Sequence, residues 1–263
     1  MRVSDGRSGT PWRGPAGWLE RLGLAAVTAR LCLAHYADVV LGRQQLDLAA
    51  LAGALRQSGL SILPAITLVT AAAGAILGRQ AASIVDEFNL PALLLLSISY
   101  AVIMELIPLL VGIMVAGRAG VALAVQQATL VVTGQMDGLL VSGVNPITFT
   151  TAPVLLAALL MSFAFAVWGS VVTLGTAFVW LLTVSDLAPS DLADALRLAI
   201  DPGDLLEAIV KPLVFALAIV LIATVNGSTG GRDPEGIGQA ATRTMVGAVT
   251  SILLIDLLFA LLW

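Results

Sequence analysis

Five stretches of this sequence are long and apolar enough to cross a lipid bilayer, and they constrain the fold more than any other feature. A transmembrane helix needs about 20 predominantly apolar residues. Only 11% of the residues are charged and 59% are hydrophobic, whereas a soluble domain carries about a quarter charged residues. The sequence therefore predicts an all-α membrane protein with five transmembrane helices. They cover approximately residues 61–79, 91–117, 152–182, 210–226 and 244–263.

The third stretch is longer than a bilayer requires, so we expect it to be tilted, or broken near Gly169 or Gly175. In the first stretch, the pair Gly74 and Gly78 has the four-residue spacing of small residues that pack helices closely. Residues 61–263 are thus predicted to form one five-span membrane domain.

The first 60 residues have a different character. Residues 1–16 are rich in Gly, Ser and Arg and are predicted to be a disordered tail. Residues 17–60 are predicted to form amphipathic helices, one over 17–41 and a shorter one over 46–60. Polar residues of the first helix, such as Glu20, Arg21 and Asp38, share one side. This pattern favours a helix in the membrane interface, and the alternative is a cytosolic helix packed on a partner.

Basic residues predict the orientation in the membrane. With the N-terminus in the cytoplasm, only Arg79, Arg197 and Lys211 fall outside, and the other ten of the 13 basic residues fall inside. The positive-inside rule therefore favours a cytoplasmic N-terminus and, after five crossings, an external C-terminus. The external loop 183–209 is acidic and is predicted to hold a short amphipathic helix on the outer surface.

Several kinds of function are disfavoured by composition. Lys211 is the only lysine, and the sequence contains no phosphate-binding G-x-x-x-x-G-K-[ST] motif. The net charge of −4 gives no reason to expect a nucleic-acid partner. His35 is the only histidine and lies outside the spans, so we expect neither a metal site nor a catalytic constellation.

Glu105 is the first candidate functional residue, because a carboxylate near the middle of a span is costly and marks a functional site by default. Gly112 and Ala116 lie on its side of the helix, as expected for close helix contact or a cavity. Pro108 removes a backbone donor and frees the carbonyl of Met104, so a bend is expected. We take Glu105, Pro108, Gly112 and Ala116 as candidates for lining a lipid cavity. The alternative is that Glu105 only ties two helices together.

Two further charges lie in or near the spans. Arg118 is predicted to mark the cytoplasmic boundary, where it would bind phosphate or backbone carbonyls or simply extend to the interface. The apolar run 120–132 would continue the second helix toward the cytoplasm. Asp256 lies within the last span and is predicted to make a helix–helix hydrogen bond.

Residues 133–144 are predicted to form a short amphipathic helix on the cytoplasmic side. Thr133 would cap its start, Asp137 suits its first turn, and Asn145-Pro146 would end it. Such a helix is typical of a docking element for a soluble partner, and the alternative is a helix resting on the membrane. The residues expected to make contact are Met136, Asp137, Leu139, Leu140 and Val144.

Several motifs together resemble the MlaE/YrbE permeases, the membrane subunits of ABC systems for lipid transport that work with Mce-domain proteins. The motifs are Glu105-Leu-Ile-Pro108, Ala116-Gly-Arg118-Ala-Gly120, Gln135-Met-Asp137, Gly143-Val-Asn-Pro146, Asn226-Gly227, Ala241-Thr-Arg243-Thr and Asp256-Leu-Leu. The resemblance covers about residues 50–263. It implies a bacterial inner-membrane permease for phospholipid or a similar lipid. A second permease chain, a cytoplasmic ATPase that uses ATP and Mg²⁺, and an external Mce-domain protein are the implied partners, and 133–144 would be the coupling helix.

The sequence departs from this family pattern in three places. Met104 stands where an arginine is usual, and Val125-Gln126-Gln127-Ala128 stands where Ala-Glu-x-Gly is usual. Gly134 and Leu140 replace the two glutamates of the coupling segment. A divergent permease half acting as a scaffold is therefore one alternative. The other is an ion-coupled secondary transporter, which would require paired intramembrane charges or broken-helix repeats.

Overall fold

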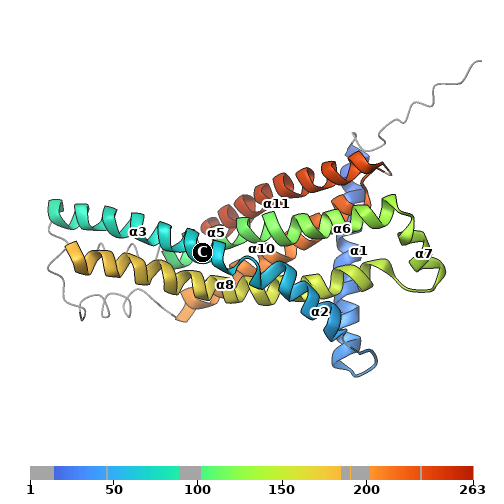
Figure 1. Ribbon diagram of the computed structural model, residues 1–263, viewed down its shortest axis with the longest axis horizontal. Helices are drawn as coiled ribbons and strands as arrows, with labels where there is room; N and C mark the ends of the chain where they lie inside the picture. The colour runs from blue at the N-terminus through green and yellow to red at the C-terminus, as the bar shows by residue number, and fades with distance from the viewer. Residues whose placement is uncertain are drawn as a thin grey trace, which may run out of the picture.

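The computed structural model describes residues 15–45, 47–88, 102–184, 190, 202–231 and 233–262, and within these ranges all regular structure is helical (Figure 1). The elements in chain order are α1 (Pro15–Val40), α2 (Leu48–Leu55), η1 (Arg56–Leu60), α3 (Leu63–Phe88), η2 (Val102–Leu106), α5 (Ile107–Val115), η3 (Ala116–Gly120), α6 (Val121–Val132), α7 (Gln135–Val141), α8 (Pro146–Val184), α10 (Pro202–Ser228) and α11 (Pro234–Leu262). Three of them, η1, η2 and η3, are π-helical turns.

Six described helical segments are long and apolar enough to cross a membrane. Five correspond to the predicted spans, and the sixth is Leu19–Val40 in α1. The long helices run roughly along one axis in Figure 1, whereas α1 crosses them. It packs against α8 and α10, with Cys32 buried and the Tyr36 hydroxyl donating to the carbonyl of Ala152 at 2.6 Å. This crossing direction is what we expect of a helix lying in the membrane interface.

The second span continues as helix well beyond residue 117, the predicted end of its apolar stretch. Its predicted first part, 91–101, lies outside the described residues. From η2 onward the helical run is continuous to Val132, so the predicted extension through 120–132 is confirmed. The π-turns η2 and η3 flank α5. Helix α10 begins at Pro202, so the last residues of the predicted loop 183–209 are helical. The amphipathic helix predicted within that loop falls mostly outside the described residues.

Helix α8 is one continuous helix of 39 residues through both Gly169 and Gly175, so the predicted alternative of a break is wrong. At 1.5 Å per residue it is about 58 Å long, nearly twice the hydrocarbon thickness of a bilayer. Helix α3 packs along it at close range, since a Cβ atom at Gly78 would lie 2.7 Å from the carbonyl oxygen of Ala177. Gly74 faces the carbonyl of Thr173 in the same way, which confirms the predicted small-residue packing pair.

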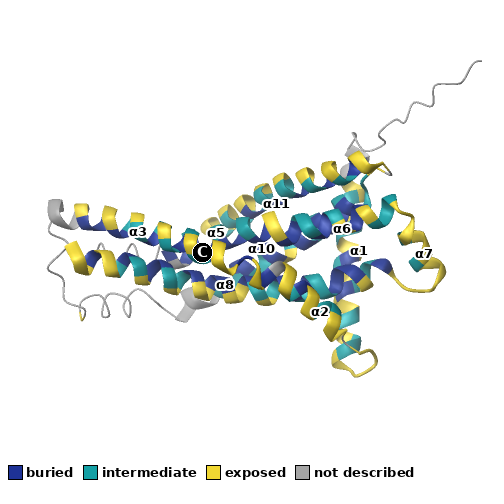
Figure 2. Cartoon of the chain, viewed as in Figure 1, coloured by how far each residue is buried: buried dark blue, intermediate teal, exposed yellow. Residues whose placement is uncertain are grey.

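The core lies where α5 and α6 meet α8, α10 and α11. Phe165, Phe215, Ile219 and Ile252 are almost completely buried there. Figure 2 shows buried residues concentrated along α6 and α10 and exposed residues on the outer faces of α3 and α11. Outward apolar side chains are the expected surface of a helix bundle in lipid, where apolar surface meets apolar solvent.

Candidate functional site

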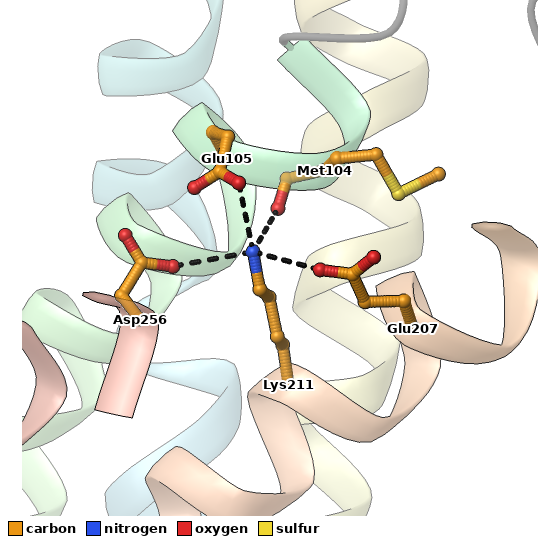
Figure 3. Close-up of polar contacts among 5 residues, drawn as sticks. All are labelled: Met104, Glu105, Glu207, Lys211 and Asp256. Atoms are coloured by element: carbon orange, nitrogen blue, oxygen red, sulfur yellow. Dashed lines mark hydrogen bonds and ion pairs between the residues drawn. The ribbon is translucent and has the colours of Figure 1, made fainter. Parts of the chain in front are cut away.

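Lys211 is the centre of the most strongly charged site in the described part of the bundle. Its side chain, on α10, is completely buried. Its Nζ atom donates to the Met104 carbonyl at 3.1 Å and to Glu105 Oε1 at 3.0 Å. Glu207 Oε1 lies 3.0 Å away and Asp256 Oδ1 3.4 Å away (Figure 3). We call these five residues the Lys211 cluster.

Three segments distant in sequence build the Lys211 cluster. Met104 and Glu105 come from η2, Glu207 and Lys211 from α10, and Asp256 from α11. Glu207 and Lys211 are four residues apart, a spacing that places side chains on the same face of a helix. Pro108 cannot donate to the carbonyl of Met104, and that carbonyl instead accepts from Lys211. The predicted freeing of this carbonyl is confirmed, and the π-turn η2 is the accompanying distortion.

The cluster stabilises a buried charge whose removal from water would otherwise cost too much free energy. An ammonium group removed from water needs partners that replace its hydration, and an unpaired one costs several kcal/mol. Lys211 has four oxygen neighbours for its three N–H donors. With all groups ionised, one positive charge faces three carboxylates. Because the partners come from three segments, the cluster ties α10 to the second and last spans.

Exposure differs among the three carboxylates. The Glu207 side chain is only 4% exposed, that of Asp256 is 18% exposed, and that of Glu105 is 46% exposed. Glu105 is therefore the carboxylate of the Lys211 cluster whose side chain faces outward. The half-buried residues on the neighbouring face of this helical run are Leu106, Leu109, Leu110, Ile113 and Met114.

These findings change the interpretation of three residues. Glu105 has a counter-charge, Lys211. Lys211, which was counted among the external basic residues, has a side chain that is buried within the bundle on α10. Glu207, predicted as part of an acidic outer surface, is buried. The sequence does contain a signal for the pairing of Glu207 with Lys211, since the two residues have the i, i+4 spacing of a helical ion pair.

Asp256 was predicted to make a helix–helix hydrogen bond. The structure places it in helix–helix polar contact, but as an ion pair with Lys211. Its Oδ1 atom makes no well-aligned hydrogen bond with any described residue. The role in polar packing is thus retained, while its partner is a charge rather than a neutral group.

Pro108, Gly112 and Ala116 are the other three candidates for lining a lipid cavity. All three are buried. A Cβ atom at Gly112 would lie 3.0 Å from Phe215 and 3.4 Å from Ile252, so the small residue lets α5 approach α10 and α11. The predicted small-residue face thus packs closely at Gly112, and the assignment of these three residues to a lipid cavity stays a prediction.

Arg118 is exposed and lies in η3, within a helical run that continues to Val132. The structure therefore leaves its guanidinium available to phosphate groups, and its role at the cytoplasmic boundary stays a prediction. The two residues that follow it in the motif, Ala119 and Gly120, are buried against the bundle. A Cβ atom at Gly120 would lie 2.7 Å from Ile219, which explains the small residue there.

The predicted coupling segment forms α7 at one end of the bundle (Figure 1). Gly134, with φ of +71°, precedes it and Gly143, with φ of +76°, follows it, both in the left-handed region that favours glycine. The N-cap is Gly134, so the prediction that Thr133 caps the helix is wrong. The Thr133 hydroxyl instead donates to the carbonyl of Thr129.

No residue of α7 is buried. Met136 and Leu139 are half-buried, Asp137 is exposed, and the Leu140 side chain is 59% exposed. Val144, just beyond the helix, is also exposed. The five predicted contact residues therefore lie on an accessible element, as docking requires, although Met136 and Leu139 are less accessible than Leu140. Asn145 ends the segment and caps α8, since its Oδ1 accepts from the backbone of Ile147 at 3.0 Å.

A second buried polar group, which the sequence analysis did not identify, lies behind α7. The Gln127 side chain on α6 donates to the hydroxyls of Thr150 and Thr151 on α8. Thr151 in turn lies 3.2 Å from the Thr224 hydroxyl on α10. We call these four residues the Gln127 network. It joins the three helices that lead from the α7 end into the bundle.

No group of three or more His, Cys, Asp or Glu side chains is placed to hold a metal ion in the described ranges. The site is thus built from ion pairs and hydrogen bonds between helices. A family model described as "Permease MlaE" matches residues 51–262. This range contains the Lys211 cluster, the Gln127 network and α7.

Two known proteins with similar sequences carry permease names, and a third is similar over a shorter part of the chain. A "Probable ABC transporter permease protein" of Rickettsia felis is 27% identical over 197 residues, which cover 74% of this chain and 76% of the relative. The "Intermembrane phospholipid transport system permease protein MlaE" of Haemophilus influenzae is 27% identical over 190 residues, 70% of each chain. The chloroplastic protein TRIGALACTOSYLDIACYLGLYCEROL 1 of Arabidopsis thaliana is 28% identical over 152 residues, 58% of this chain and 43% of the relative.

Proposed function

The chain belongs to the MlaE permease family, and on that premise we infer that it is the membrane subunit of an ABC transporter that moves phospholipid or a similar lipid. The observation that carries this conclusion is the family match over residues 51–262. It includes every described helix from α3 to α11. The printed name of the Haemophilus influenzae relative, a phospholipid transport permease, supports the lipid class.

We propose that α7 couples the permease to a separate cytoplasmic ATPase, which binds ATP and Mg²⁺. The helix projects from the bundle with exposed apolar side chains at Leu140 and Val141. An amphipathic helix of this kind fits an apolar groove on a partner. Because α7 contacts both α6 and α8, a movement of the ATPase would be transmitted to both spans.

We propose that Glu105 faces a lipid cavity formed between this chain and a second permease chain. It is the only one of the four cavity candidates with an outward-facing side chain, and half-buried apolar residues surround it on the helix face. Lipid leaving the cavity would pass to an external Mce-domain protein. Of the other three candidates, Gly112 lets α5 approach α10 and α11, so its contribution to transport is indirect.

The proposed location is a bacterial inner membrane, with the N-terminus and α7 on the cytoplasmic side. The test is a pair of reporter fusions at Ser190 and Asp233, which precede and follow α10. We expect the first to report the outside and the second the cytoplasm. Reporters on the same side would contradict the proposed path of α10 through the membrane.

Transport itself is tested with the permease and the ATPase that purifies with it, reconstituted into vesicles. We expect ATP-dependent movement of a fluorescent phospholipid and its loss when the ATPase carries an inactivating change in its nucleotide site. The Leu140→Asp variant is expected to abolish movement by releasing the ATPase. Movement without any ATPase would contradict the proposed mechanism.

The same experiment distinguishes the proposed function from its two alternatives, a scaffold and an ion-coupled transporter. A scaffold, for which the substituted coupling segment is the supporting observation, would hold its partners without moving lipid when ATP is added. The Lys211 cluster supplies the paired intramembrane charges that an ion-coupled transporter would require. Such a transporter would lose activity when an uncoupler removes the proton gradient, whereas an ATP-driven permease would not.

A further inference from the structure

A groove outside the Lys211 cluster lies between α1, α10 and α11. It has a volume of about 590 Å³, which is within the range of small-molecule sites. Figure 1 shows α1 crossing this part of the bundle, close to the end of α10 and the start of α11. Because α1 covers the groove only partly, the groove is open on one side.

The two ends of the groove differ in polarity. Helices α10 and α11 form an antiparallel hairpin, so Asn226 near the end of α10 and Arg243 near the start of α11 lie at the same level. Deeper in the bundle the lining is apolar, with Leu221 and Ile222 on α10. Ser251 closes the far end, eight residues beyond Arg243 and therefore about 12 Å along α11. The groove thus runs from a basic, polar end to an apolar end.

Arg21 on α1 supplies the second positive charge of the polar end. Its Nε atom is buried and has no hydrogen-bond partner among the residues that the structure describes. A buried donor without an acceptor costs about 1–3 kcal/mol, so this atom favours an acceptor from outside the chain. Arg243 uses one donor on Gln239 at 3.2 Å and keeps others free for a ligand.

The described lining of the groove contains two arginines and no carboxylate. The acidic residue closest to Arg243 along α11 is Glu235, which lines an adjoining shallow hollow that shares Thr242 and Arg243 with the groove, so the two arginines still outnumber the one carboxylate nearby. Charge complementarity therefore favours an anion at the polar end. The apolar end, in contrast, suits a hydrocarbon chain. Only an amphiphile satisfies both ends at once.

We propose that this groove binds one phosphate-bearing lipid from the surrounding membrane. Its phosphate lies between Arg21 and Arg243, because guanidinium groups bind phosphate with paired, charge-assisted hydrogen bonds. One acyl chain follows Leu221 and Ile222, and the open side lets the rest of the lipid remain in the bilayer. The bound lipid fastens α1 to the α10–α11 hairpin. The site lies on a different face from Glu105 and does not depend on ATP-driven transport.

The test is native mass spectrometry of the protein purified in mild detergent and supplied with phosphatidylglycerol. We expect the unchanged protein to retain one phosphatidylglycerol and the Arg21→Gln/Arg243→Gln variant to retain it at least about tenfold less well. Arg56→Gln, which removes an exposed arginine of η1, is the matched control and should bind as the unchanged protein does. Diacylglycerol with the same chains, which lacks the phosphate, should bind poorly to all three proteins.

A second variant tests the apolar end without touching a charge. A Cβ atom at Gly247 would lie 3.4 Å from Ile222, an ordinary contact, so a side chain can start there without a clash and Gly247→Leu is expected to fill the groove. We expect it to lower retention of phosphatidylglycerol with an unchanged melting temperature. Equal retention by the double arginine variant, equal binding of diacylglycerol, or displacement of the lipid by inorganic phosphate alone would each overturn the proposal. Disulfide-linked dimers formed through Val246→Cys would assign the groove to a second copy of the chain and also overturn it.

Discussion

The Lys211 cluster and α7 lie at opposite ends of the helical run that begins in η2, and they depend on their surroundings in opposite ways. The cluster contains a fully buried ammonium group whose partners come from three segments of the chain. No residue of α7 is buried, and among the described elements the helix packs mainly against its neighbours along the chain, α6 and α8. The charged groups of the Lys211 cluster are thus paired inside the protein, whereas apolar side chains of α7 are exposed on its surface.

This difference separates two kinds of requirement. A residue whose partners are all internal is needed for the fold, and its replacement lowers stability whatever the protein binds. A residue whose surface is free is needed for a partner, and its replacement leaves stability almost unchanged. Glu105 and the Gln127 network lie between these extremes. Four variants, described in order of their expected effect on the free energy of unfolding, test this ranking.

Lys211→Met should have the largest effect. It leaves buried Glu207 without its counter-charge, and breaking a buried ion pair in this way costs about 3–5 kcal/mol. The measurement is thermal unfolding in detergent, followed by size exclusion and intrinsic fluorescence. Arg79→Met removes an exposed charge from α3 and should change stability by less than about 0.5 kcal/mol. Equal melting temperatures for the two variants would show that the cluster does not stabilise the fold.

Glu105→Leu should have a smaller effect on stability and a larger one on transport. The variant removes one of the partners of Lys211, but the Glu105 side chain is 46% exposed, so we expect a loss of about 1–2 kcal/mol. Lipid transport in vesicles should fall several-fold, while Glu105→Gln, which keeps an oxygen acceptor for Lys211, should retain most of it. Normal transport by Glu105→Leu would remove Glu105 from the proposed cavity.

Gln127→Leu tests the second polar group. It removes the donor to Thr150 and Thr151, and hydrogen bonds between membrane helices contribute about 0.6–1.7 kcal/mol. Gln126→Leu changes the exposed neighbour on the same helix and serves as the control. We expect only the first to lower the melting temperature. If both variants have the same melting temperature, the network is not a stabilising link between α6 and α8.

Leu140→Asp should have the smallest effect on stability, within about 0.5 kcal/mol, because the side chain is 59% exposed. Its effect on association should be large, with the ATPase no longer retained during affinity purification. Ser142→Asp places the same charge on the exposed residue that caps the end of α7 and should leave the ATPase bound. If Leu140→Asp retains the ATPase, docking lies elsewhere, for instance in the turn 229–233.

Much of the site was predictable because its signals are local. Glu105 stands out as a carboxylate in an apolar run, and Pro108 directs attention to the carbonyl of Met104. The amphipathic pattern around Met136 and Leu140 identified α7. The structure changed the interpretation of these residues rather than their selection, since Glu105 has a counter-charge and Gly112 is a packing position.

The sequence by itself determined the class of the protein, because apolar length and charge density decide whether a chain can cross a bilayer, and its motifs determined the family. It also determined approximate helix positions, since each depends on neighbours along the chain. Only the tertiary structure decided that Lys211 meets Glu105 and Asp256, 106 and 45 residues away in sequence. The same holds for the groove between α1, α10 and α11. Such contacts depend on how helices cross and rotate against one another, and that is set by packing summed over many side chains rather than by any local pattern.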